Sequence, residues 1–167
     1  KEGIIRNELA LIVLGRLTMT DRKLRAGYYN LNSTMSSWDV FNRLRKGMII
    51  QYFVTIPEGF TLDDIKIKLK ARGLINNESW QLVNNRDFLS SLNIKAPSLE
   101  GYIYPDTYNL AKGADPEDVF RIMVQRLRDN FDKSLRKRAE ELGMSENEVL
   151  TLASIIEREA KCPDERP

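Results

Sequence analysis

The spacing of apolar residues divides the first third of the chain into helix-like and strand-like stretches. Residues 4–17 repeat apolar side chains with a helical period, and residues 27–31 predict a short strand. The sequence SSWD at residues 36–39 opens a helix that stops at Gly47. Residues 49–56 are rich in β-branched and aromatic side chains, which predicts a second strand. The order helix, strand, helix, strand predicts a small α/β module.

The pattern becomes mostly helical after a turn at residues 57–59. Thr61 is expected to cap a helix at its start, and Gly73 is expected to end it. Two shorter helices are predicted near residues 78–85 and 86–92.

The last third of the chain predicts one short strand and two longer helices. A strand and a turn are expected within residues 96–110. Asp115, followed by proline and two acids, starts a long helix whose apolar period continues to Gly143. The final helix over residues 145–160 opens with a capping box, SENE.

A short internal repeat, which we call the echo, links residues 3–8 and 73–78 of the sequence. GIIRNE at residues 3–8 is repeated as GLINNE at residues 73–78. The second copy follows a predicted strand and helix, so the first should too. The echo therefore predicts that the first module is incomplete at its N-terminal side and leaves a strand edge open for pairing with another chain.

The residue types in the chain limit the catalytic and metal sites that it can form. The 167 residues carry 26 basic and 24 acidic side chains, and a net charge of +2 gives no strong field for nucleic acid. The chain has no histidine, which excludes Ser-His-Asp and Cys-His catalysis, and its one cysteine, Cys162, leaves no Cys/His zinc site. No stretch reaches the roughly 18 apolar residues of a membrane-spanning helix. Any chemistry must come from carboxylates, lysines, hydroxyls or backbone groups.

The last helix places a glutamate on its apolar face. With Leu152 at the origin of a helical wheel, Glu159 lies at about 340°, inside the apolar arc, and Glu157 at about 140°, on its margin. An acid on an apolar face is desolvated, as a general acid near neutral pH requires, so Glu159 is the candidate catalytic residue. The alternative is that the helix frays and Glu159 meets solvent. The two acids lie too far around the helix to flank one glycosidic bond as a pair.

A second segment, LEGYIYPDTY at residues 99–108, combines three tyrosines with two acids. Rings that stack and carboxylates that accept hydroxyl hydrogen bonds suit a sugar-binding wall. The candidate binding residues are Glu100, Tyr104, Asp106 and Tyr108. The alternative is a strand that ends in a Pro-Asp turn with half-buried tyrosines.

Other conspicuous residues are interpreted as structural. Trp38 and Trp80 lie beside apolar periodic positions and are expected in the core. The basic cluster at residues 133–138 is interleaved with acids, which is typical of a solvated helix face.

Two motifs give the chain a resemblance to a known family. LEGYIYPDTY, followed about fifty residues later by LASIIERE at residues 152–159, resembles the YceG-like family of endolytic murein transglycosylases. GYY at residues 27–29 and TIPEGFT at residues 55–61 are also similar to that family's pattern. The likeness covers nearly the whole chain.

The resemblance implies an α+β chain in which a LysM-like module, residues 1–56, precedes the first part of a YceG-like catalytic domain, residues 57–167. It implies cleavage of the β-1,4 bond between N-acetylmuramic acid and N-acetylglucosamine, with formation of 1,6-anhydro ends. It also implies that the reaction needs no metal or cofactor. The family's catalytic acid falls on Glu159, and Glu157 joins the binding residues. The implied protein is anchored by a single span in the inner or cytoplasmic membrane and faces the periplasm or cell wall. Its implied partners are peptidoglycan strands and cell-wall synthesis proteins.

The chain also departs from the family's pattern. The Asn-Arg-Leu and Gln-x-Asp-Pro-Thr segments that follow the catalytic helix in the family are absent, so we expect a chain truncated at both ends and of little activity by itself. The main alternative is a non-catalytic peptidoglycan-binding fragment. A pyridoxal-phosphate lyase is disfavoured, because no phosphate-binding glycine loop lies beside a candidate Schiff-base lysine.

Overall fold

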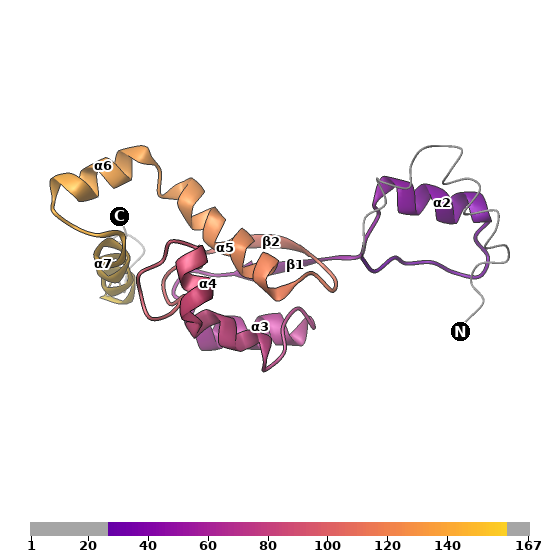
Figure 1. The fold of residues 1–167 in the computed structure, drawn as a ribbon, viewed down its shortest axis with the longest axis horizontal. Helices are drawn as coiled ribbons and strands as arrows, with labels where there is room; N and C mark the ends of the chain where they lie inside the picture. Colours follow the sequence, from indigo (N-terminus) through magenta and orange to yellow (C-terminus); the bar gives the residue numbers. More distant parts are fainter. Residues whose placement is uncertain (1–26, 160–167) are drawn as a thin grey trace. The chain divides into compact units, whose positions relative to one another are not determined.

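The structure is a computed structural model that describes residues 27–159 (Figure 1). The described residues form two compact units, one of residues 27–52 with 111–113 and the other of residues 53–110 with 114–159. The predicted helix at residues 4–17, the first copy of the echo and the strand edge expected there lie outside the described residues, as does Cys162. The assignment of residues 1–56 and 57–167 to two family domains stays a prediction.

The first unit contains helix α2 (Ser37–Lys46). The Ser36 side chain accepts from the Asp39 N–H, and the Asp39 carboxylate accepts from the Ser36 N–H in return. Gly47 ends the helix in the left-handed conformation, with a φ of 61°. Both predicted ends of this helix are confirmed.

The strand predicted at residues 27–31 is wrong in extent. Within the described residues it forms one antiparallel bridge, between Tyr29 and Ile49. Beyond the bridge the Asn32 side chain accepts from the Thr34 N–H, and its carbonyl accepts from the Met35 N–H. Because a short polar side chain offers the backbone this local alternative, the chain turns before a ladder can extend.

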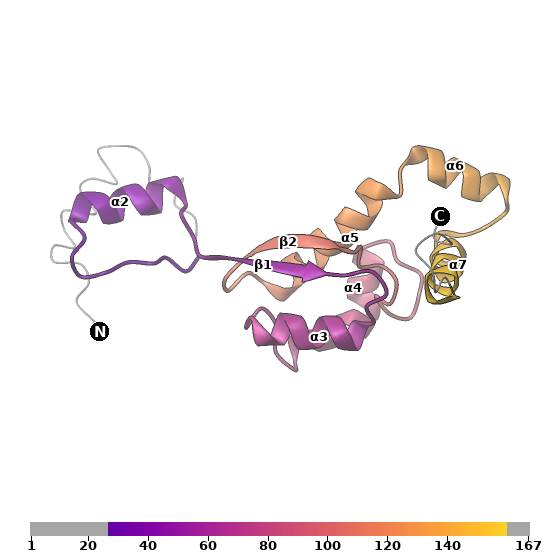
Figure 2. The same cartoon turned by 180° about the vertical axis from the view of Figure 1, so that it is seen from behind.

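A two-stranded antiparallel sheet joins β1 (Gln51–Ile56) and β2 (Asp106–Ala111) (Figure 2). The Thr55 and Thr107 hydroxyls lie 2.9 Å apart across the two strands. Side chains alternate between a solvent face and a face buried on the core. Four side chains form the buried face: Val54, Ile56, Tyr108 and Leu110.

The remaining elements of the second unit are helical. They are α3 (Leu62–Ala71), the 3-10 helix η1 (Ser79–Asn84), α4 (Arg86–Ser91), α5 (Pro116–Asn130), α6 (Lys133–Glu141) and α7 (Glu146–Glu159). Helices together with a small antiparallel sheet confirm the α+β class, whereas the LysM-like character of the first module stays a prediction. Within residues 27–159, no helix combines the length and apolarity needed to cross a membrane.

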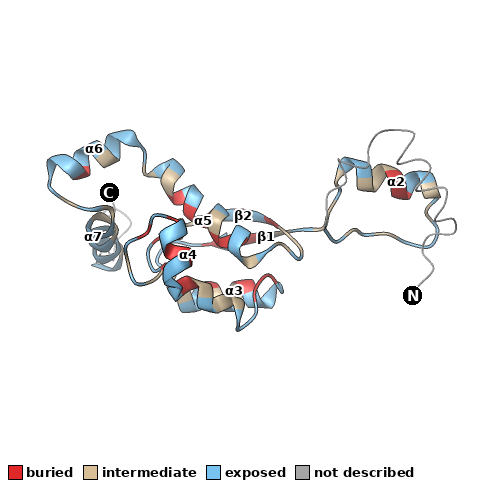
Figure 3. Ribbon diagram, in the orientation of Figure 1, coloured by how far each residue is buried: buried red, intermediate tan, exposed pale blue. Residues whose placement is uncertain are grey.

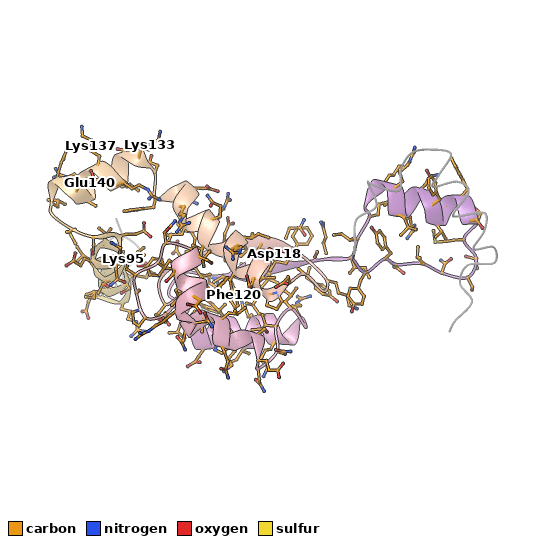
Figure 4. All side chains as sticks on the ribbon, viewed as in Figure 1. Lys95, Asp118, Phe120, Lys133, Lys137 and Glu140 are labelled. Atoms are coloured by element: carbon orange, nitrogen blue, oxygen red, sulfur yellow. The ribbon has the colours of Figure 1, made fainter. Side chains whose placement is uncertain are left out.

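The core of the second unit centres on Phe120 of α5 (Figures 3 and 4). Its ring lies edge-on to Trp80 of η1 and to Phe88 of α4, with centroids 6.0 and 6.4 Å away. Trp80 is therefore a core contact, as predicted. Trp38 is not, because it is 51% exposed even though its ring stacks on Phe41 in the first unit.

The single long helix predicted from Asp115 to Gly143 is in fact two helices. α5 ends at Asn130, and Phe131 leaves the helical region with a ψ of 72°. Asp132 then caps α6, since its side chain accepts from the Leu135 N–H over 2.9 Å. Apolar period alone could not reveal this break, because an N-cap aspartate restarts a helix without interrupting the spacing of apolar residues.

Candidate functional site

The candidate pocket is a cavity of about 360 Å³ in the second unit. The loop before α3, the loop at residues 100–105 and one face of α7 form most of its wall. Several lining groups can bind a polar ligand. The aromatic rings are those of Phe60 and Tyr104, and the hydroxyls are those of Thr61 and Ser154. The charged groups are the carboxylates of Glu58, Glu100 and Glu157 and the guanidinium of Arg158.

The loop before α3 is fixed at the point where the helix begins. Thr61 caps this helix, as predicted, and it forms a capping box with Asp64, whose carboxylate accepts from the Thr61 N–H over 3.0 Å. The next N–H, that of Leu62, donates to Oε2 of Glu100 over 3.1 Å. Glu100 therefore lines the pocket, as its predicted binding role requires, but one of its oxygens also ties the two loops together.

The Phe60 ring is held from one side by a cation. The Lys68 ammonium lies 4.7 Å from the ring centroid, and it also donates to the Thr55 carbonyl over 2.8 Å. This arrangement orients the ring before any ligand arrives.

Tyr108 supports the pocket wall from behind. Its side chain is buried, and its hydroxyl donates to the backbone carbonyl of Tyr104. Burial raises the pKa of the Tyr108 hydroxyl, and the nearby Asp106 charge raises it further, so the hydroxyl remains a donor. Tyr104 therefore lines the pocket, whereas Tyr108 does not line it and contacts the pocket wall through this hydrogen bond.

Asp106 also lies outside the candidate pocket. It lines a separate groove between β2 and α5, where its carboxylate accepts from the Arg126 guanidinium and from the Thr107 N–H. These two hydrogen bonds hold the pKa of Asp106 below its ordinary value. Its carboxylate thus links β2 to α5, a structural role that the tyrosine-rich motif did not indicate.

α7 begins as predicted but turns a different face to the pocket. Ser145 and Glu148 form the expected capping box, with Ser145 N–H donating to the Glu148 carboxylate over 2.8 Å. The pocket is lined by the face that carries Leu150, Ser154 and Glu157.

The apolar arc of α7 is largely exposed within the described structure. Leu152, Ile155 and Ile156 are 47, 53 and 41% exposed. Glu159, on the same arc at the last residue of the helix, is exposed as well, whereas Glu157 is half-buried. The desolvation expected for Glu159 is therefore not provided by the described residues. The wheel identifies the most apolar face, but it does not determine which face the rest of the chain covers.

The chemistry of the candidate pocket suits an uncharged polyhydroxyl ligand. Aromatic rings offer stacking surfaces, and carboxylates and hydroxyls offer hydrogen-bond acceptors close to them. Among the described residues no group of three or more acidic, cysteine or histidine side chains could hold a metal ion.

Sequence reasoning missed Phe60 and Ser154 as lining residues, as well as Glu58. Phe60 and Glu58 belong to the TIPEGFT segment that carries part of the family resemblance, so the segment itself was a usable signal.

The amino-acid sequence matches curated relatives along almost its whole length. Endolytic murein transglycosylases of Streptococcus pneumoniae strains D39 and R6 are 27 and 28% identical to this chain, over alignments of 199 and 202 positions. Each alignment covers 99% of this chain and 35% of the relative. The chain thus spans about a third of the length of these relatives.

A solved structure shows the same fold. The 2.6 Å crystal structure of a YceG-like protein from Listeria monocytogenes superposes with a TM-score of 0.60 at 26% sequence identity. The match covers 96% of this chain and 58% of that protein. The profile of the YceG-like family matches residues 1–167. Agreement of profile, relatives and fold along the same residues shows that this chain belongs to the YceG-like family.

Proposed function

We propose that the protein is an endolytic lytic transglycosylase of peptidoglycan that cleaves the β-1,4 bond between N-acetylmuramic acid and N-acetylglucosamine. The observation that carries the proposal is membership of a family whose curated relatives are named endolytic murein transglycosylases. A pocket with two rings and three carboxylates beside the helix that bears Glu159 supports it.

Glu159 serves as the single acid and base. Its protonated carboxyl gives a proton to the glycosidic oxygen as the bond to C1 of the muramic residue breaks. The resulting carboxylate then takes the proton from the C6 hydroxyl as that oxygen bonds to C1. The substrate supplies its own nucleophile, so the products are a 1,6-anhydro end and a free hydroxyl, without a water molecule or second carboxylate.

The candidate pocket holds one part of the glycan strand. Tyr104 stacks on a sugar ring, and Glu157 accepts hydrogen bonds from sugar hydroxyls. Glu100 adds an acceptor from the opposite loop. Asp106 and Tyr108 were also predicted to bind substrate. In this proposal Tyr108 holds the Tyr104 backbone of the pocket wall, and Asp106 links β2 to α5.

The proposed cellular location of the protein follows from its proposed substrate. A protein that cleaves peptidoglycan must face the periplasm or cell wall, and we propose anchorage by a single span in the inner or cytoplasmic membrane. Proteins of cell-wall synthesis are its proposed partners.

A non-catalytic peptidoglycan-binding role is the second candidate. The exposed position of Glu159, which lines none of the cavities described above, favours it over catalysis by this segment alone.

The test compares wild type, Glu159→Gln and Glu157→Gln in the protein at its natural length. Gln keeps the shape of Glu but moves no proton, so Glu159→Gln should lower release of anhydro-muropeptides from purified sacculi by about 10²–10⁴-fold. Glu157→Gln should weaken binding and leave most of the turnover at saturating substrate. Sacculus pull-down by the Glu159→Gln protein controls for folding. Wild-type product release by Glu159→Gln refutes the catalytic assignment, and sacculus binding without any anhydro product from wild type supports the binding role instead.

A further inference from the structure

A further cavity, which we call the basic groove, shares no lining residue with the candidate pocket. It has a volume of about 760 Å³ and is built from the end of η1, from α4 and from the segment after α4. Its apolar floor includes the buried side chains of Leu89 and Ile94. The polar side chains around it include Asn84, Arg86, Asn93 and Lys95.

All charged side chains that line the basic groove are positive. Arg86 and Lys95 both line it, and none of its lining residues is acidic. Neither cation forms an ion pair within residues 27–159. The neighbour of Arg86 in sequence, Asp87, does not line the groove. The candidate pocket has the opposite character, with carboxylates outnumbering its single cation.

The backbone of the basic groove is held in place by hydrogen bonds. Asn93, with a φ of 52°, ends α4 in the left-handed conformation that asparagine tolerates. Its N–H donates to the Ser90 carbonyl, and the Ile94 N–H donates to the Leu89 carbonyl, each over 2.9 Å. The Arg128 guanidinium donates to the neighbouring Leu92 carbonyl from α5. These hydrogen bonds therefore fix the backbone that carries the polar side chains of the groove.

We propose that the basic groove binds a carboxylate-bearing peptide, the stem peptide of peptidoglycan; the identity of this peptide rests on the proposed function. Arg86 and Lys95 pair with carboxylates of the peptide. Asn84 and Asn93 each offer a donor and an acceptor, which matches the N–H and C=O groups of peptide bonds. The apolar floor accepts alanine methyl groups. A phosphate polymer would need the cations but neither the amide acceptors nor the apolar floor, so the lining favours a peptide.

The matched comparison uses two double variants with the same change of charge. Arg86→Gln with Lys95→Gln removes both cations of the basic groove. Lys133→Gln with Lys137→Gln removes two exposed lysines of α6, which point away from the rest of the unit in Figure 4. Any general effect of net charge should appear equally in both.

Binding is measured by calorimetry with the free tetrapeptide L-Ala-γ-D-Glu-L-Lys-D-Ala and with its fully amidated form. We expect wild type and the α6 variant to bind the tetrapeptide equally, and the groove variant to bind it at least about tenfold more weakly. Amidation should weaken binding to wild type by a similar factor. Equal binding by the groove variant and wild type overturns the proposal, as does failure of wild type to bind the peptide.

Polyglycerol phosphate is added as a competitor. Tighter binding of this polymer, lost in the groove variant, overturns the peptide assignment in favour of a phosphate ligand. Because the tetrapeptide contains no glycosidic bond, its binding does not depend on cleavage. A protein that binds the peptide through the groove but releases no anhydro-muropeptides refutes the proposed function and leaves the peptide site standing.

Discussion

The hydroxyl of Tyr108 tests how the candidate pocket is held together. Tyr108→Phe removes only the oxygen that donates to the Tyr104 carbonyl, since the buried ring keeps its packing. A hydrogen bond of this kind contributes about 0.5–1.5 kcal/mol to the free energy of unfolding. Tyr104 is half-buried, so water can reach the freed carbonyl and replace part of the bond. We therefore expect a loss of about 1 kcal/mol.

Tyr102 supplies a matched control. It is buried like Tyr108, but its hydroxyl reaches its partner, Asn147 Oδ1, only over 3.5 Å. A bond of that length is weak, so Tyr102→Phe should cost less than about 0.5 kcal/mol.

Urea unfolding followed by tryptophan fluorescence measures both variants. In a Trp38→Phe background the remaining tryptophan, Trp80, packs edge-on against Phe120 and reports the second unit alone. The expected loss corresponds to a fall in Tm of about 2–4 °C for a chain of this size. The reasoning fails if Tyr102→Phe costs as much as Tyr108→Phe, or if Tyr108→Phe leaves the free energy of unfolding unchanged.

Two further outcomes follow from contacts in the second unit. Phe120→Ala should lower the free energy of unfolding by about 3–5 kcal/mol, because the ring is fully buried between two aromatic neighbours. Urea unfolding measures this loss, and a loss below about 1 kcal/mol would contradict the core described here. Asp106→Asn should lower Tm slightly at pH 7. The hydrogen bond from Arg126 holds the pKa of Asp106 in the folded protein below its unfolded value of about 3.9. The ionised Asp106 carboxylate therefore stabilises the fold fully above about pH 3.9, and this contribution is lost as the pH falls through the folded pKa. The Tm difference between wild type and variant should therefore shrink in acid; a difference that stays constant from pH 7 to pH 2 would contradict it.

Helix starts were predictable because their signals are local. Ser36, Thr61, Asp115 and Ser145 cap the helices that they were expected to cap. Each cap is a contact between residues two or three positions apart, so the sequence alone contains both partners. The same is true of the cap at Asp132, but there the uninterrupted apolar period favoured one continuous helix.

The candidate site was only partly predictable because its parts meet through tertiary contacts. The LEGYIYPDTY motif brought Glu100, Tyr104, Asp106 and Tyr108 together in sequence, yet the structure directs only the first two to the pocket. Alternation along β2 buries Tyr108, and a partner on α5 holds Asp106. Neither outcome is encoded within the motif itself.

The capping boxes and the sheet differ in how far apart their partners lie in sequence, and this difference bears on the order of folding. The boxes of α2, α3 and α7 form between residues three positions apart and need no distant contact. Pairing β1 with β2 brings together Thr55 and Thr107, which are 52 residues apart, and closes the long loop between them. Contacts of high sequence separation slow folding, since the entropy of loop closure is lost before the contacts stabilise the chain. We expect helix starts to appear early and strand pairing to set the overall rate at which the second unit folds.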